Sequence, residues 1–157
     1  MVKILKFLLY TLIFGSLLMI VFPYLLITLN DSLGLLSFSS SLGKILGMVL
    51  IVVGAFNYIY CSFLFMRFGK GTPLFTQSPT KFVEKSLYKY SRNPMYLGHF
   101  LIFLGEFLFF GKILLLLYLF LMFIVFNLMV IYYEEPSLLK KFGTEYINYL
   151  KRVPRWI

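Results

Sequence analysis

The sequence has few ionisable side chains and almost no cysteine or histidine. Of its 157 residues 13% are charged and six are acidic, whereas a soluble domain carries about 25% charged residues. The single cysteine, Cys61, excludes an internal disulfide. The single histidine, His99, has no partners of the kind that hold a metal ion, so we expect no metal site. The low charge argues against a soluble domain.

The sequence is correspondingly rich in apolar residues. They make up 61% of the chain, compared with roughly 45–50% in soluble domains. A single domain of this length cannot hide so much apolar surface, so the bilayer must solvate most of it. We predict one all-α integral membrane domain over residues 1–157, with two spans in residues 1–68 and a core that carries the sequence motifs in residues 69–157.

The net charge of +9 comes from short basic stretches beside apolar runs. This arrangement favours membrane lipids over nucleic acid as partners. The basic stretch before the first apolar run resembles a signal peptide. That run continues past twenty residues without a small-x-small cleavage site, so we expect a retained helix.

Four apolar stretches predict four transmembrane helices, at about 4–29, 45–68, 94–110 and 112–133. Pro23 is expected to kink the first. A turn at Gly111 would fold the last two into a helical hairpin over residues 94–133. The third helix would be about 25 Å long, short for a hydrocarbon core of about 30 Å.

Thirteen of the 15 basic residues lie at the start of the first span, from the end of the second span to the start of the third, or after the fourth. The other two, Lys44 and Lys112, lie at the opposite turns. The positive-inside rule therefore predicts a multi-pass protein with both termini in the cytoplasm. The tail after the fourth span has apolar residues at three- or four-residue spacing, which predicts an amphipathic segment interrupted at Gly143 and Pro154.

Two polar clusters flank the hairpin, and the hairpin would return both to the same membrane surface. Arginine, asparagine, tyrosine and glutamate are costly at a lipid boundary, so we interpret the pair of clusters as a binding site. The clusters are Arg92-Asn93-Pro94-Met95-Tyr96 and Glu134-Glu135-Pro136.

In order and spacing, these clusters together with Phe142-Gly143-x-x-Tyr146-x-x-Tyr149 and Val153-Pro154-Arg155 resemble the integral-membrane methyltransferases. That group contains isoprenylcysteine carboxyl methyltransferase, the phospholipid N-methyltransferases and small prokaryotic relatives. The resemblance implies methyl transfer from S-adenosylmethionine, with S-adenosylhomocysteine as product, to an amphiphilic or lipidic acceptor at the cytoplasmic face.

The resemblance also implies roles for individual residues. Arg92 and Glu134 are the catalytic candidates, and Glu134 can pair with the ammonium of the cofactor. Tyr88 or Tyr96 can face its sulfonium, because a cation over an aromatic ring gains roughly 0.5–2 kcal/mol. The expected cofactor-binding residues are Thr80, Lys81, Phe82, Val83, Tyr88, Asn93, Pro94, Met95, Tyr96 and Glu134.

The sequence departs from the prenylcysteine enzymes at two positions. Asn93 stands where those enzymes usually have histidine, and the form Asn-Pro-Met-Tyr is closer to the phospholipid enzymes. Val130 stands where they place the arginine that holds the substrate carboxylate. We therefore do not expect a prenylcysteine carboxylate as acceptor.

Other interpretations of these residues stay open. Arg92 could be an interfacial anchor, and the tyrosines near the boundary could form an aromatic belt. His99 fits a structural role better than catalysis. Glu106 needs a partner inside the membrane, and both residues are candidates for substrate contact. The alternative functions are a nicotinamide-dependent membrane reductase and a non-enzymatic membrane scaffold.

Overall fold

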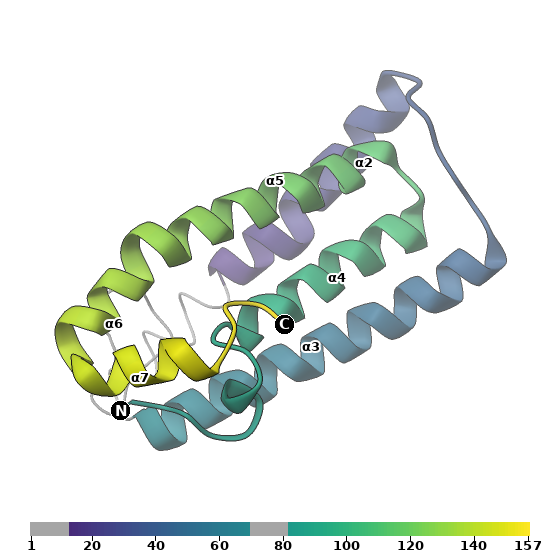
Figure 1. The fold of residues 1–157 in the computed structure, drawn as a ribbon. Coiled ribbons are helices and arrows are strands. Elements are labelled where there is room, and N and C mark those ends of the chain that lie inside the picture. The colour runs from purple at the N-terminus through teal and green to yellow at the C-terminus, as the bar shows by residue number, and fades with distance from the viewer. Residues whose placement is uncertain (1–12, 70–81) are drawn as a thin grey trace.

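The computed structural model describes residues 13–69 and 82–157, and Figure 1 shows them as a bundle of long helices with a shorter helical segment folded across one end. The elements are a π-helical turn η1 (Leu17–Val21), α2 (Phe22–Ser32), α3 (Ser41–Gly69), a 3-10 turn η2 (Ser86–Lys89), α4 (Pro94–Phe110), α5 (Ile113–Met129), a π-helical turn η3 (Val130–Glu134), α6 (Glu135–Phe142) and α7 (Thr144–Arg152).

The structure confirms the expected all-α membrane fold. Within residues 13–69 and 82–157, three helical stretches are long and apolar enough to cross a membrane: Ile13–Ser32, Ser41–Gly69 and Ile113–Phe142. The fourth, α4, has 17 residues and is the short member, as predicted. Pro94 lies in its first turn and Gly111, at φ 66°, follows its last. These are the residues that start and stop helices, so both ends of α4 follow from the sequence.

The helix that carries the predicted fourth span extends beyond residue 133, because it continues through Pro136 to Phe142. A proline inside a helix lacks the N–H that would pair with the carbonyl four residues earlier, and its ring crowds that carbonyl. The chain accommodates Pro136 by a wider π-helical turn directly before it, in which the Glu135 N–H bonds to the Val130 carbonyl.

The same arrangement occurs before Pro23. There the π-helical turn η1 precedes the proline, and the Phe22 N–H bonds to the Leu17 carbonyl. The hydroxyl of Tyr118 donates to the Leu18 carbonyl in this turn, at 2.9 Å. The irregularity expected at Pro23 therefore takes the form of a π-helical turn on its N-terminal side.

Helices α3 and α4 touch through their backbones. A Cβ atom on Gly47 would lie 2.6 Å from the Gly105 carbonyl oxygen, and one on Gly54 would lie 2.6 Å from that of Gly98. The glycines recur seven residues apart on both helices, so they form one continuous seam. Helices in lipid associate by close packing of small residues, because the lipid removes the hydrophobic driving force.

At the end of the bundle where the turn after α4 lies, a hydrogen-bond network around Asn30 connects α2 to the loop that follows it and to α5. The Asn30 amide donates to the Leu35 carbonyl at 3.2 Å, and its oxygen accepts from the Leu114 N–H at 3.3 Å. An isolated antiparallel bridge joins Ser37 to Lys112, and the Lys112 ammonium pairs with Asp31. We call this the Asn30 network.

At the opposite end, α6 and α7 fold back over the segment before α4. Tyr146, Tyr149 and Val153 are buried there, and the ring of Phe82 packs against both tyrosines with centroids 5.8 and 4.9 Å away. Gly143, at φ 52°, separates the two helices. The amphipathic tail and its break at Gly143 are therefore as predicted, and its apolar face lies on protein.

Candidate functional site

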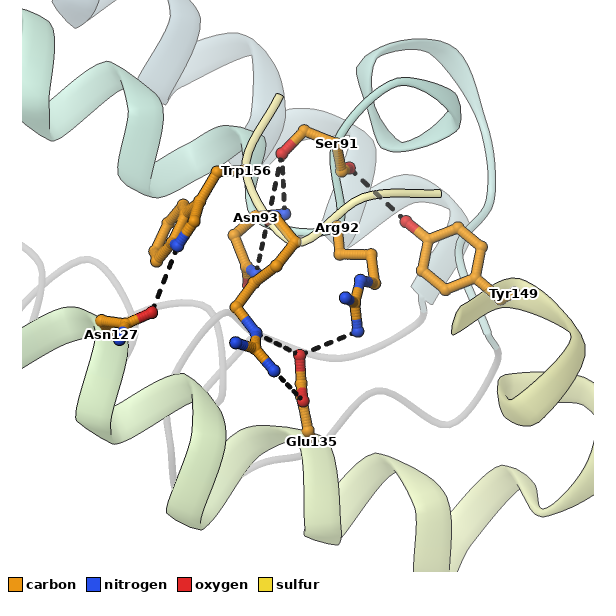
Figure 2. A network of polar contacts seen from close by, with 8 residues as sticks. Ser91, Arg92, Asn93, Asn127, Glu135, Tyr149 and Trp156 are labelled. Carbon is orange, nitrogen blue, oxygen red and sulfur yellow. Dashed lines mark hydrogen bonds and ion pairs between the residues drawn. The ribbon is translucent and has the colours of Figure 1, made fainter. Parts of the chain in front are cut away.

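The two polar clusters meet at the α6–α7 end of the bundle, as Figure 2 shows. Glu135 lies between two arginines. Its carboxylate accepts from Arg92 Nη1 at 2.8 Å, and from Arg155 Nε at 2.8 Å and Nη2 at 3.0 Å. The hydrogen bonds to Glu135 raise the pKa of Arg155. Two charge-assisted pairs in a partly buried place make Glu135 a structural centre.

The turn at residues 91–93 holds the segment after α7 by its backbone. We call residues 153–156 the strap. The Arg92 N–H donates to the Pro154 carbonyl at 3.0 Å, and the Asn93 side-chain amide donates to the Arg155 carbonyl at 3.0 Å. The hydroxyl of Ser91 donates to the same carbonyl at 3.4 Å. The backbone N–H of Arg92 and the side-chain amide of Asn93 thus hold the strap in place.

Glu134 has a different environment from Glu135. Its carboxylate accepts a short hydrogen bond from the Tyr96 hydroxyl. Among residues 13–69 and 82–157, no lysine or arginine forms an ion pair with Glu134. The charge of Glu134 therefore has no described cationic partner.

Aromatic rings enclose the Tyr96 side of this pair. The Tyr96 ring centroid lies 4.7 Å from that of Phe126, 6.0 Å from His99 and 6.4 Å from Trp156. His99 Nδ1 lies 2.9 Å from the Met95 carbonyl oxygen. A carbonyl only accepts, so this contact assigns the proton to Nδ1. The rings make an apolar surround for the Tyr96–Glu134 pair.

Tyr88 lies at the edge of a second apolar cluster with Val83 and Cys61. Its carbonyl accepts from the Tyr149 hydroxyl at 2.6 Å. Burial raises the pKa of Tyr88, so its hydroxyl is held neutral.

The structure brings some of the predicted site residues together and separates others. Tyr96 contacts Glu134, Arg92 contacts Glu135, and Val83, Tyr88 and Met95 share one cluster. Pro94 is buried in the first turn of α4. Phe82 packs instead among Phe142, Tyr146 and Tyr149, and Thr80 and Lys81 lie outside the described residues.

Glu106 lies apart from the clusters. It is ten residues from Tyr96 on α4, about 15 Å along the helix axis. It is 7% exposed, and its Oε2 atom has no hydrogen-bond partner among the described residues. His99, the other candidate for substrate contact, lies next to Tyr96, with its ring also 4.8 Å from that of Tyr58 on α3.

Sequence reasoning assigned no role to several residues at this end. Trp156 packs on Tyr96, and its indole N–H donates to the Asn127 side-chain oxygen at 3.2 Å. A signal for Asn127 was available, because it is the only amide in the apolar run of α5. Tyr58 and Cys61 on α3 also reach the site, although the first two spans carry no motif.

A model of the phospholipid methyltransferase family matches residues 42–145. The match takes in α3, the residues 91–93 turn, the hairpin and both glutamates, and it ends before the strap. No curated protein and no solved structure matches the chain significantly. Because the match covers about two thirds of the chain and includes both polar clusters, the chain belongs to the phospholipid methyltransferase family.

Proposed function

We propose that this protein transfers a methyl group from S-adenosylmethionine to a lipidic or amphiphilic acceptor at the cytoplasmic face of the membrane. Membership of the phospholipid methyltransferase family indicates a membrane methyltransferase. The contrast between the two adjacent glutamates supports the cofactor. Glu135 is neutralised by Arg92 and Arg155, whereas Glu134 has only the Tyr96 hydroxyl as its described partner.

The residues present suit the chemical groups of this cofactor. Glu134 can accept hydrogen bonds from its ammonium. Tyr96, whose hydroxyl bonds to Glu134, and Tyr88, which shares a cluster with Met95, offer aromatic rings that suit the positive sulfonium. When bound, the cofactor supplies an activated methyl group for in-line displacement.

The protein's own contribution is position and exclusion of water. The Tyr96 hydroxyl orients the Glu134 carboxylate, and the rings of His99, Phe126 and Trp156 surround Tyr96. Holding reacting atoms at about 3–3.5 Å in the right orientation can remove about 7–11 kcal/mol from a reaction barrier. Arg92, the second catalytic candidate, contributes to this arrangement through Glu135.

The position of Val130 supports an acceptor without a carboxylate. Val130 stands where the prenylcysteine enzymes keep an arginine. Its buried, apolar side chain supplies neither a charge nor a hydrogen-bond donor there. A buried anion needs a fixed cation such as the planar guanidinium of arginine. An amine, thiol or neutral lipid acceptor would not require a fixed cation in this site.

Direct binding measurements test whether the protein binds the proposed cofactor. Purified protein in nanodiscs is titrated calorimetrically with S-adenosylmethionine, with S-adenosylhomocysteine and, as a comparison ligand, with NADPH. We expect 1:1 binding of the first two and none of NADPH. Absence of heat and of thermal stabilisation by S-adenosylmethionine, from folded protein, would falsify the proposal, and binding of NADPH alone would replace it with a reductase.

A labelling experiment tests the orientation, which follows from the positive-inside rule. Cysteines are introduced singly at Ser39 and Lys81 in a Cys61→Ala background, and intact cells are treated with a membrane-impermeant maleimide. We expect modification at position 39 only. Modification at position 81 alone would put the polar clusters outside the cell, away from a cytoplasmic cofactor.

A further inference from the structure

The strap is fixed in place by contacts to three separate parts of the fold. Its backbone is held by the turn at residues 91–93, and the Arg155 side chain is held by Glu135. The Trp156 indole reaches α5 and bonds to Asn127 (Figure 2). A segment with this many tethers has one position relative to α4 and α5, so the place of Trp156 is determined by the fold.

Trp156 lies across the boundary between α4 and α5. Its ring packs on Tyr96 and Phe100 of α4, with centroids 6.4 and 5.5 Å away, and on Phe123 of α5, at 5.8 Å. These contacts put the indole beside the tyrosine that bonds to Glu134.

The α3–α4 and α4–α5 interfaces differ in how readily they could open for a ligand. Between α3 and α4 the glycine seam brings backbone against backbone, so separation would require both helices to move. Between α4 and α5 the contact is made by rings, among them Phe100, Phe103, Phe123 and Phe126. Rotation of side chains is a small and fast change by comparison. A molecule that arrives from the lipid therefore has its easiest approach between α4 and α5.

We propose that Trp156 forms the membrane-side wall of the acceptor site and that the strap exists to hold it there. This inference rests on the proposed methyl transfer and adds the side from which the acceptor enters. The indole face directs the acceptor toward Tyr96–Glu134 and keeps out water. Its N–H is already bonded to Asn127, so the face presented to the acceptor is apolar. The ligand class is a membrane lipid, with its uppermost chain carbons against the indole.

The sequence contains one tryptophan, so in vesicles of lipid and this protein alone the tryptophan fluorescence reports on Trp156. Protein in such vesicles is saturated with S-adenosylhomocysteine, and lipid spin labels placed near the headgroup or near the chain end are compared with aqueous iodide. We expect the label near the headgroup to quench roughly twofold more than the label near the chain end, as for an interfacial ring. Iodide should quench least. Stronger quenching by iodide, or no quenching by lipid labels, would overturn the proposal.

Variants test the consequence for transfer, measured as tritium passed from labelled S-adenosylmethionine to the lipids of nanodiscs made from the host membrane. Trp156→Ala should slow transfer about tenfold, because the acceptor is no longer held against the reacting group. It should leave cofactor affinity within about twofold of the unsubstituted protein. Trp156→Phe, which keeps an aromatic wall but loses the N–H to Asn127, should lose less transfer than Trp156→Ala.

The matched control is Phe120→Ala, which removes an exposed α5 ring that does not contact Trp156 among the described residues, and it should change neither quantity. Unchanged transfer in Trp156→Ala, or a large loss of cofactor binding in folded Trp156→Ala, would contradict a role toward the acceptor. If Trp156→Ala does not fold, the quenching experiment and Trp156→Phe decide. Failure of the unsubstituted protein to bind cofactor would instead remove the proposed function and leave the quenching result standing.

Discussion

At the Asn30 network, a neutral side chain closes the bundle. Asn30 is fully buried, and its amide bonds to backbone groups of the following loop and of α5. At the opposite end, charged groups meet around Glu135, and a second carboxylate, Glu134, has no described cation. Both ends join the chain segments between helices, so both stabilise the fold.

The difference lies in what each end leaves without a partner. Among the described residues, the buried side-chain atoms that lack a hydrogen bond are Ser62 Oγ, Arg92 Nε and Glu106 Oε2. None belongs to the Asn30 network, and Arg92 belongs to the site. Unsatisfied buried polar groups cost free energy, so an end that retains them serves something besides stability. A polar cluster in a membrane protein is thus a better candidate for function when its pairing is incomplete.

The largest expected effect on stability comes from Glu135→Gln. Two guanidinium groups would lose their shared carboxylate in a partly buried place, which should cost about 2–4 kcal/mol. Thermal unfolding in detergent measures the loss. Glu145→Gln, at an exposed position on α7, is the control and should leave the midpoint unchanged. A midpoint equal to that of the unsubstituted protein would show that the ion pairs contribute little.

Asn30→Leu should be nearly as damaging, although it removes no charge. The substitution leaves the Leu35 carbonyl and the Leu114 N–H without their partner, at a cost of about 2–3 kcal/mol. Cofactor affinity, measured by calorimetry on the folded fraction, should not change. Asn148→Leu on the exposed face of α7 serves as the control. A weakened cofactor affinity would mean that the two ends are coupled.

Glu134→Gln should show the opposite pattern. Loss of the charge opposite the cofactor ammonium should cost about 1.5 kcal/mol of binding, roughly tenfold in affinity. The unfolding midpoint should stay close to normal, because Gln can still accept from Tyr96. Calorimetry and thermal unfolding of this variant beside Glu135→Gln give the comparison. Equal losses of affinity in both variants would show that the two glutamates are not divided between binding and structure.

The smallest effect is expected for Lys112→Met. The Lys112–Asp31 ion pair includes a largely exposed carboxylate, so it should contribute less than about 1 kcal/mol. The same unfolding measurement, repeated at low and high salt, checks this. A shift as large as that of Asn30→Leu would mean that the charges, and not the buried amide, close this end.

The sequence predicts those features that depend on local signals. Pro94 and Gly111 mark the ends of α4, and the three- or four-residue spacing of Tyr146 and Tyr149 marks the buried face of α7. The continuation of the helix past Pro136 was not predictable from residue types, because a π-helical turn is a response of the backbone.

The different environments of Glu134 and Glu135 were predicted only in part. Glu134 was expected to matter more for the cofactor, and the structure leaves its charge without a described ion pair. The central place of Glu135 was not foreseen, since its partners lie 43 and 20 residues away in the chain. Trp156 was missed for the same reason, because nothing near it in the sequence indicates that it reaches Asn127.

The π-helical turn before Pro136 also has a geometric consequence. A π-helical turn takes in one residue more than a regular α-helical turn, and each residue of an α-helix turns by about 100° around the axis. The extra residue therefore rotates the residues that follow it relative to those that precede it. The side chains of α6 face about 100° away from the direction that an unbroken continuation of α5 would give them.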